Sequence, residues 1–497
     1  MLVLPQGDEI AAPVSARFWG IQSMTDAATT LAPVERSYWG VIALIALGQV
    51  ILAIDFCVSS IGLASIGRDL TAGPATLSWV VTVFSLTYGG FLILGGRVAD
   101  LFGHRRACIL GLILFGGGSL LAASSTSIQM LIAVRAIEGL GGALLTPTSF
   151  SLINVMLPDG PIRHRAYSVF GVTQGLSYIL GLYVGGALVT HFGWRSGFLL
   201  NVPAIIIAIV LAWRQIPLPD PNAARSKVDI AGAILITAGM GLLMFALSSA
   251  GRHGLVSLEA LVPLVLGISA IVALIVVESN IEHPLVSLSV FRYPNLAGAD
   301  LACIAMIAAG SSVFVLLPLF LQRTFHFTPE ISGLAMLPYC AAVVAGGQVV
   351  GLAMSRFTLG QCAGGGIILF VGATLTFCLG WGGTGNFEFI MLPAMIVAAF
   401  GATAASLAIM ALSTGQVAAK DQGLASAVLM TCQQIGVSLG VSIVFAVIAT
   451  ASLDGSAVTV AFHHAFIASA TFAALALVST VVLTRSPKNA TIPIRSH

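Results

Sequence analysis

Long apolar stretches follow one another along nearly the whole chain, each bounded by charged residues, prolines or clusters of glycine. An α-helix needs about 20 mainly apolar residues to cross the hydrocarbon core of a bilayer. The pattern therefore predicts an all-α, polytopic membrane protein with 14 transmembrane helices. The fourteen predicted spans lie near residues 39–66, 76–97, 106–125, 128–156, 165–190, 196–214, 230–250, 256–277, 296–321, 331–354, 362–381, 388–411, 422–450 and 463–484.

One polar stretch divides these spans into unequal groups. It follows the sixth span, is rich in Pro, Asn, Arg and Lys, and has the composition of a connector. The next two spans are joined by only a short loop, so we interpret them as a hairpin inserted between two six-helix bundles. The predicted 6+2+6 organisation has a cytoplasmic tail over 1–37, a first bundle over 38–216, the cytoplasmic connector and hairpin over 217–290, a second bundle over 291–485 and a tail over 486–497.

The composition excludes several other classes of protein. Of the residues, 58% are hydrophobic and only 8% are charged, whereas soluble domains carry about a quarter charged residues. The net charge is +2 and the basic residues are spread over short loops, so we expect no nucleic-acid partner. The seven cysteines form no Cys-X-X-Cys pair, and no His-Glu-X-X-His motif occurs. We therefore expect no metal, no cofactor and no enzymatic activity.

The distribution of Lys and Arg predicts the orientation. Cytoplasmic loops carry an excess of these residues, and 16 of the 21 lie on the side of the N-terminal tail, against four on the other side. Residues 1–36 mix acidic and basic side chains and lack the basic start and apolar core of a secretory signal. We expect a multi-pass protein of the cell membrane with both termini in the cytoplasm.

Three charged residues stand out at membrane depth, away from the ends of the predicted spans: Asp55 in the first, and Arg135 with Glu138 in the fourth. Charged groups at membrane depth are costly and are by default functional candidates. Arg135 and Glu138 are three residues apart and share one helical face. An arginine stays charged, whereas a carboxylate can take up a proton, so these residues are candidates for proton coupling. A static ion pair that joins helices is the alternative. Asp300, at the start of the ninth span, is expected at the interface with water.

The short segment between the second and third spans contains Gly96, Asp100, Gly103, Arg105 and Arg106. Its glycines permit a tight turn and close helix packing, and its charges can pair at helix ends. This spacing resembles the loop signature of the major facilitator superfamily, with Leu101 and His104 where arginine is common.

Further motifs resemble the fourteen-helix drug:proton antiporter branch of that superfamily. They include Asp55 in the first span and the segment from Arg135 to Gly139, in which Glu138 replaces the usual glutamine. The fifth span has the glycines of the branch but lacks its proline, which Leu182 replaces. These glycines are Gly181, Gly185 and Gly186.

The resemblance implies a transporter that exports hydrophobic or amphipathic small molecules, such as drugs or antibiotics, in exchange for protons, by rocking two bundles about a central cavity. Gln174, Gln433 and Gln434 are candidates for substrate binding, with hydrogen bonds in helix packing as the alternative. The implied partners are the substrate, protons and the lipid bilayer, and one chain is expected to function alone. A proton symporter that imports a nutrient, which Leu182 favours, and a binding or signalling protein with a transporter fold are the alternatives.

Overall fold

The computed structural model of the protein describes residues 35–158, 160–217, 230–253, 257–278, 293, 295–354, 356–377, 387–418, 421–453 and 458–483. The regular structure in these ranges is entirely helical. In chain order the elements are α2 (Glu35–Asp69), α3 (Pro74–Phe102), α4 (His104–Ala123), α5 (Ile128–Met156), α6 (Pro161–Phe192), α7 (Trp194–Leu199), α8 (Asn201–Gln215), α9 (Ile230–His253), α10 (Leu258–Glu278), α11 (Leu296–Thr324), α12 (Pro329–Ala335), α13 (Leu337–Ala353), α14 (Leu359–Thr376), the π-helix η3 (Phe387–Met391), α15 (Leu392–Thr414), α16 (Gln422–Leu453) and α17 (Val458–Leu483).

These elements form fourteen membrane-spanning units. Thirteen helical segments of the described residues are long and apolar enough to cross a bilayer, and α9, with 24 residues, supplies the fourteenth. Three units consist of two consecutive elements each, namely α7 with α8, α12 with α13, and η3 with α15. The predicted all-α fold with fourteen membrane helices is confirmed.

Glycines allow some of these helices to follow one another without a loop. Gly103 has a φ of 88° and Gly193 a φ of 80°, a backbone region that residues with a side chain rarely adopt. Gly103 alone separates α3 from α4, and Gly193 alone separates α6 from α7. The chain thus changes direction within one residue at both places.

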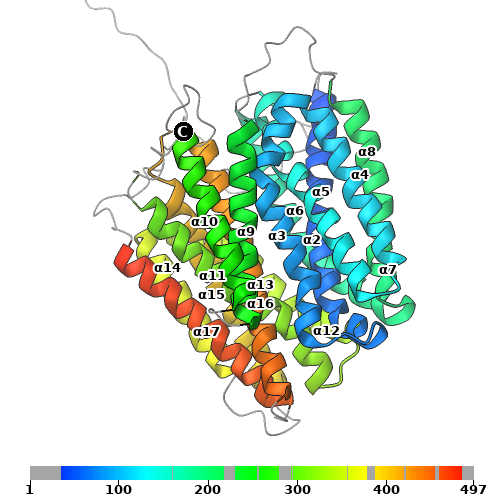
Figure 1. Ribbon diagram of the computed structural model, residues 1–497, viewed down its shortest axis with the longest axis vertical. Helices are drawn as coiled ribbons and strands as arrows, with labels where there is room; N and C mark the ends of the chain where they lie inside the picture. The colour runs from blue at the N-terminus through cyan, green and yellow to red at the C-terminus, as the bar shows by residue number, and fades with distance from the viewer. Residues whose placement is uncertain are drawn as a thin grey trace, which may run out of the picture.

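The helices form two groups with a hairpin in front of their junction (Figure 1). The first bundle consists of α2 to α8 and the second of α11 to α17. They meet where α2 packs on α11, where α3 packs on α16, and where α6 packs on α12 and α13. In the α9–α10 hairpin, α9 packs against α3 and α16, so the hairpin covers one of these seams.

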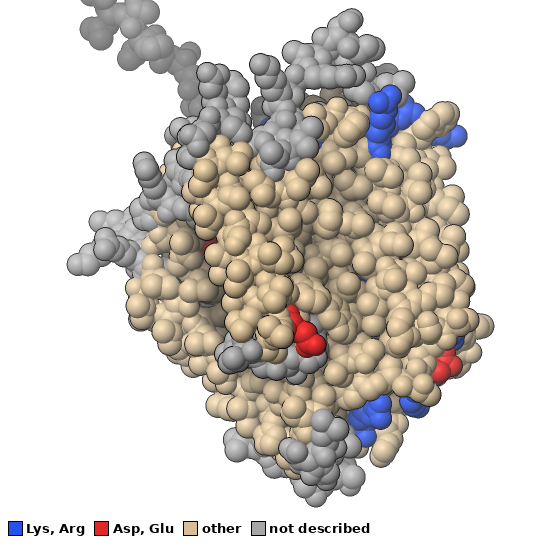
Figure 2. Space-filling model, viewed as in Figure 1, with Lys and Arg blue, Asp and Glu red and all other residues tan. Residues whose placement is uncertain are grey.

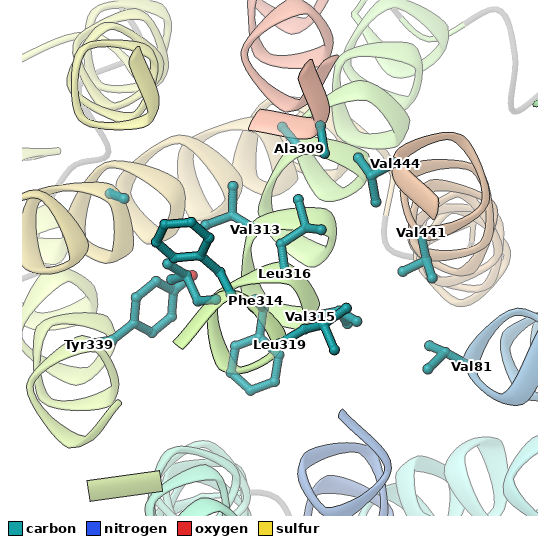
Figure 3. Close-up of a cluster of buried hydrophobic side chains, with 14 of the residues drawn as sticks. Val81, Ala309, Val313, Phe314, Val315, Leu316, Leu319, Tyr339, Val441 and Val444 are labelled. Carbon is teal, nitrogen blue, oxygen red and sulfur yellow. The ribbon is translucent and has the colours of Figure 1, made fainter. Parts of the chain in front are cut away.

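The buried apolar core continues across the seam between the bundles. Figure 3 shows Phe314 of α11 near Tyr339 of α13, with Val441 of α16 on one side and Val81 of α3 beyond it. All four side chains are at most 8% exposed. The two bundles are therefore joined by the same kind of packing that holds each of them together.

Charge is nearly absent from the middle of the molecular surface. In the face drawn in Figure 2, most of the described Lys, Arg, Asp and Glu side chains lie toward the two ends of the helices, and the surface between them is almost wholly uncharged. Large apolar side chains are exposed in the middle of several helices, such as Ile113 of α4 at 53% and Ile268 of α10 at 50%. A surface of this kind fits contact with lipid rather than water. Below, the end at which α2 begins is called the tail side, and the opposite end the far side.

Candidate functional site

A buried cluster of three charged residues lies inside the first bundle. The Nη1 atom of Arg135 donates to Asp55 Oδ2 at 2.6 Å and to Glu138 Oε2 at 2.6 Å. All three side chains are 0% exposed. The sequence separates Asp55 from Arg135 by 80 residues, and the packing of α2 on α5 brings them together. One guanidinium therefore faces two carboxylates away from water.

Neighbouring helices supply further hydrogen bonds to this cluster. Arg135 Nε donates to the Val80 carbonyl of α3 at 3.0 Å, and Ser119 Oγ of α4 donates to Glu138 Oε1 at 2.9 Å. Asn201 Nδ2 donates to Asp55 Oδ1 at 3.3 Å. Five elements thus contribute to one polar network, as buried charges require if they are to be tolerated.

Two local features of the sequence make room for these contacts. Asn201 is the first residue of α8, one residue after Leu200, and both α7 and α8 pack on α2, the helix that carries Asp55. In α4, a Cβ atom on Gly118 would lie 2.5 Å from the Cγ atom of Glu138. The glycine therefore leaves the space that the glutamate side chain fills.

A cavity of about 560 Å³ lies between the two bundles, a size that suits a drug-sized molecule. Its walls include Gln49 of α2, Tyr88 of α3, Thr403 of α15 and Gln434 of α16. The lining residues of α3, α5 and α15 lie in the middle and in the tail-side half of those helices, over 84–92, 146–150 and 402–410. The cavity therefore occupies the middle and the tail-side half of the molecule.

Aromatic rings close this cavity toward the far side. Phe56 of α2 stacks on Phe314 of α11, with ring centroids 5.5 Å apart. Tyr178 of α6 and Tyr339 of α13 contact the same Phe314 ring at 5.7 and 6.0 Å. Four helices, two from each bundle, thus meet at one cluster of aromatic rings around Phe314.

Beyond these rings, direct contacts seal the two bundles at the far side. Gln322 Nε2 donates to the Ile61 carbonyl at 3.0 Å, and His191 Nε2 lies 3.1 Å from Glu330 Oε2. A Cβ atom on Gly186 would lie 2.7 Å from the Pro329 carbonyl oxygen. In this conformation the protein is therefore closed at the far side.

The structure places the predicted glycines of α6 at two different contacts. A Cβ atom on Gly181 would lie 2.8 Å from Cys57 Cβ, and one on Gly185 would lie 2.7 Å from Val58 Cγ2, so these two glycines face α2. Gly186 faces α12 of the second bundle. Leu182, which replaces the expected proline, is 0% exposed, and α6 is one helix of 32 residues around it.

The residues of the loop signature lie at the tail side, where α3 gives way to α4. Gly103 makes the one-residue turn described above, Arg105 places its guanidinium carbon 5.5 Å from the centre of the Trp213 ring, and Arg106 is exposed. The side chain of Asp100 lies outside the described residues. A Cβ atom on Gly96 would meet only the Pro147 side chain, at 3.5 Å. These residues are thus separate from the charged cluster.

Of the three glutamines proposed for substrate binding, two line the cavity. Gln433 and Gln434 are on its α16 wall, and Gln433 Nε2 lies 3.4 Å from the sulfur of Met410. The side chain of Gln174 lies outside the described residues. Sequence reasoning did not single out Gln49, because nothing in an isolated apolar span distinguishes a polar residue that faces a cavity from one that faces a neighbouring helix.

The expectation that Asp300 lies at an interface with water is wrong. Its side chain is 5% exposed, and Ser413 Oγ of α15 donates to its Oδ1 atom at 2.6 Å. Although Asp300 is close to the first residue of α11, the packing of α15 on that end of the helix covers it. At the same end, Tyr293 donates its hydroxyl to Asp421 Oδ2 at 2.7 Å, a bond that raises the pKa of the phenol.

Solved structures with the same architecture are transporters. A structure of PepTSo, a transporter of the POT family, superposes with a TM-score of 0.65 at 17% identity and covers 91% of this chain and 97% of its own. A bacterial homologue of the human lysosomal transporter Spinster, in an inward-facing and unoccupied conformation, has a TM-score of 0.65 at 16% identity, with coverages of 92% and 100%. At these identities the likeness concerns the fold alone.

Sequence comparison is more specific. The chain is 29% identical to a puromycin resistance protein of Streptomyces alboniger over 92% of both chains. It is 30% identical to a cephamycin export protein of Amycolatopsis lactamdurans over 87% of this chain and 90% of that protein. The family model described as Major Facilitator Superfamily matches residues 45–359. With its fourteen helices, its central cavity and these relatives, the chain belongs to the Major Facilitator Superfamily.

Proposed function

We propose that this protein exports hydrophobic or amphipathic small molecules, of the kind used as drugs and antibiotics, across the cell membrane in exchange for protons. The observation that carries the proposal is the buried cluster of Asp55, Arg135 and Glu138. Two relatives that match the chain over most of its length are named for antibiotic resistance or antibiotic export, which supports the direction of transport.

The charges of the cluster support a role in proton coupling. With both carboxylates ionised, one guanidinium faces two negative charges at 2.6 Å each, so the cluster carries one net negative charge out of water. One added proton makes it neutral. Because an uncompensated charge is costly in a medium of low dielectric constant, proton binding alters the free energy of any conformation that keeps the cluster dry. Proton binding can therefore bias the equilibrium between two conformations.

The topology that we propose gives this equilibrium a direction. By the excess of Lys and Arg, the tail side is cytoplasmic, with both termini there. The described conformation then has its cavity on the cytoplasmic half and its seal on the outer half. Rocking of the two bundles would expose the same cavity to the outside. One chain supplies both walls of the cavity, so we propose that it functions as a monomer.

Proteoliposomes with opposed pH gradients test this proposal. For an exchanger, a substrate is expected to move against the flow of protons, whereas a proton symporter would move it with them, and that result would overturn export by exchange. Asp55→Asn keeps the shape of the side chain and is expected to abolish proton-driven transport.

Asp69→Asn is the matched control for this variant. Asp69 lies at the far-side end of the same helix and pairs with Arg195 at 2.6 Å, with 47% of its side chain exposed. We expect this control to transport normally. Full proton-driven transport by Asp55→Asn would remove the cluster from the coupling mechanism.

A further inference from the structure

The cavity between the bundles has an unusual lining for a binding site of its size. Among the described residues that line it there is no Asp, Glu, Lys, Arg or His. Seven of its lining residues are aromatic, and they lie on α2, α3, α5, α6, α11 and α13. The charged cluster is nearby, but Phe84 lies between, because its ring lines the cavity and also lies 4.4 Å from the guanidinium carbon of Arg135.

Two polar side chains of the first bundle line this cavity, and each has a buried atom without a hydrogen-bond partner among the described residues. One is Gln49, which is 6% exposed and whose amide Nε2 atom has no partner. The other is the hydroxyl of Ser85, which is 0% exposed. A buried donor without a partner costs about 1–3 kcal/mol. Both atoms are buried within the cavity wall, so each group gains free energy if its side chain turns toward an acceptor that a ligand offers.

From these observations, which rest on the function proposed above, we infer that the cavity selects uncharged aromatic compounds that carry acceptor oxygens, and that Gln49 is the residue that recognises such an oxygen. An ion would enter an apolar cavity without a counter-charge, at a large desolvation cost. A planar ring, in contrast, can stack between the aromatic side chains. A carbonyl or ether oxygen on that ring would accept from the Gln49 amide.

A pair of tricyclic compounds with the same ring skeleton tests the preference for a neutral ligand with an acceptor oxygen over a cation. N-methylacridone is uncharged and has one carbonyl oxygen, whereas N-methylacridinium has the same ring skeleton with a permanent positive charge and no carbonyl. Equilibrium dialysis against the protein in lipid nanodiscs, with empty nanodiscs as the blank, measures both affinities without a pH gradient. We expect the neutral compound to bind at least about tenfold more tightly, since the cation finds no counter-charge. Equal or tighter binding of the cation would overturn the inference.

Variants of Gln49 test its role separately. Gln49→Leu has nearly the same shape without the donor and is expected to weaken N-methylacridone binding about three- to tenfold, as for the loss of one hydrogen bond. Gln49→Glu, measured at pH 8, is expected to shift the preference toward the cation. Ser85→Ala, a smaller change in the same wall, should weaken binding of the neutral compound in the same direction.

Gln129→Leu is the matched control, because Gln129 is exposed near the far-side end of α5, away from the cavity. Unchanged affinity in both Gln49→Leu and Ser85→Ala, with elution profiles like that of the control, would exclude these groups from the site. These binding measurements do not depend on whether the protein transports the compound. If binding prefers the neutral compound but Asp55→Asn still transports with protons, only the coupling proposal fails.

Discussion

The Phe84 ring separates the charged cluster from the cavity: on one face it lies 4.4 Å from the guanidinium carbon of Arg135, and it also lines the cavity wall. A cation over an aromatic ring contributes about 0.5–2 kcal/mol. The same ring keeps the water of the cavity away from the ions. Phe84 thus contacts both the charged cluster and the cavity.

We predict that Phe84→Ala lets protons pass without substrate. The missing ring would leave a path for water from the cavity to Arg135 and its two carboxylates, so protons could reach the cluster in the conformation that should exclude them. Liposomes loaded with a pH-sensitive dye measure this leak after an external acid pulse. Phe150→Ala is the control, because Phe150 also lines the cavity but lies on the part of α5 nearer the tail side. A leak as large in the control would mean that any hole in the wall suffices.

Arg135 is predicted to contribute more to stability than any single partner. Arg135→Met leaves Asp55 and Glu138 buried without a counter-charge and is expected to cost about 3–5 kcal/mol of unfolding free energy. The triple variant Arg135→Met, Asp55→Asn, Glu138→Gln removes all three charges and should recover most of the loss. Thermal unfolding in detergent compares the two. Equal melting temperatures would show that lost packing, and not unpaired charge, causes the effect.

The sequence reveals some parts of this site and hides others for physical reasons. Asp55, Arg135 and Glu138 stand out because each interrupts an apolar run, and the cost of burying a charge makes such an interruption informative. Asn201 cannot be singled out in that way, because its role depends on the packing of α8 on α2, which places its side chain beside Asp55. The number of helices could be predicted because each span carries its own signal in its length and polarity.

Packing between distant helices is what the sequence hides most completely. Gly95 and Gly96 are adjacent, and the loop signature points to Gly96. In the structure, a Cβ atom on Gly95 would clash with the Ala143 carbonyl group, whereas one on Gly96 would lie 3.5 Å from Pro147. Which of two neighbouring glycines is needed depends on the rotation of α3 against α5, and that rotation is set by contacts along the whole helix pair.

These two glycines give a matched pair of variants. We predict that Gly95→Ala costs about 1–3 kcal/mol of unfolding free energy, as for an overpacked interior. Gly96→Ala should be neutral, or stabilising by up to about 1 kcal/mol, because alanine favours the helix. Unfolding temperatures in detergent, together with transport rates, measure both. A larger loss for Gly96→Ala would contradict the described packing of α3 on α5.

The seal at the far side leads to a prediction about conformational balance. Gly186 belongs to the first bundle and faces the Pro329 carbonyl of the second, where a methyl group would lie 2.7 Å from the oxygen. Gly186→Ala therefore penalises only the conformation that is closed at this side. A cost of about 1–3 kcal/mol changes the ratio of the two conformations about five- to 150-fold.

Spin labels at Ser124 and Arg323, both exposed at the far side on different bundles, report this ratio through electron–electron distance measurements. They require a background in which the accessible native cysteines are replaced. We expect Gly186→Ala to shift the distribution of label-to-label distances toward longer values. Gly351→Ala should leave it unchanged, because no atom lies within 4 Å of a Cβ at Gly351. An unchanged distribution in Gly186→Ala, with an unchanged melting temperature, would mean that α6 and α12 separate too little for one methyl group to affect closure.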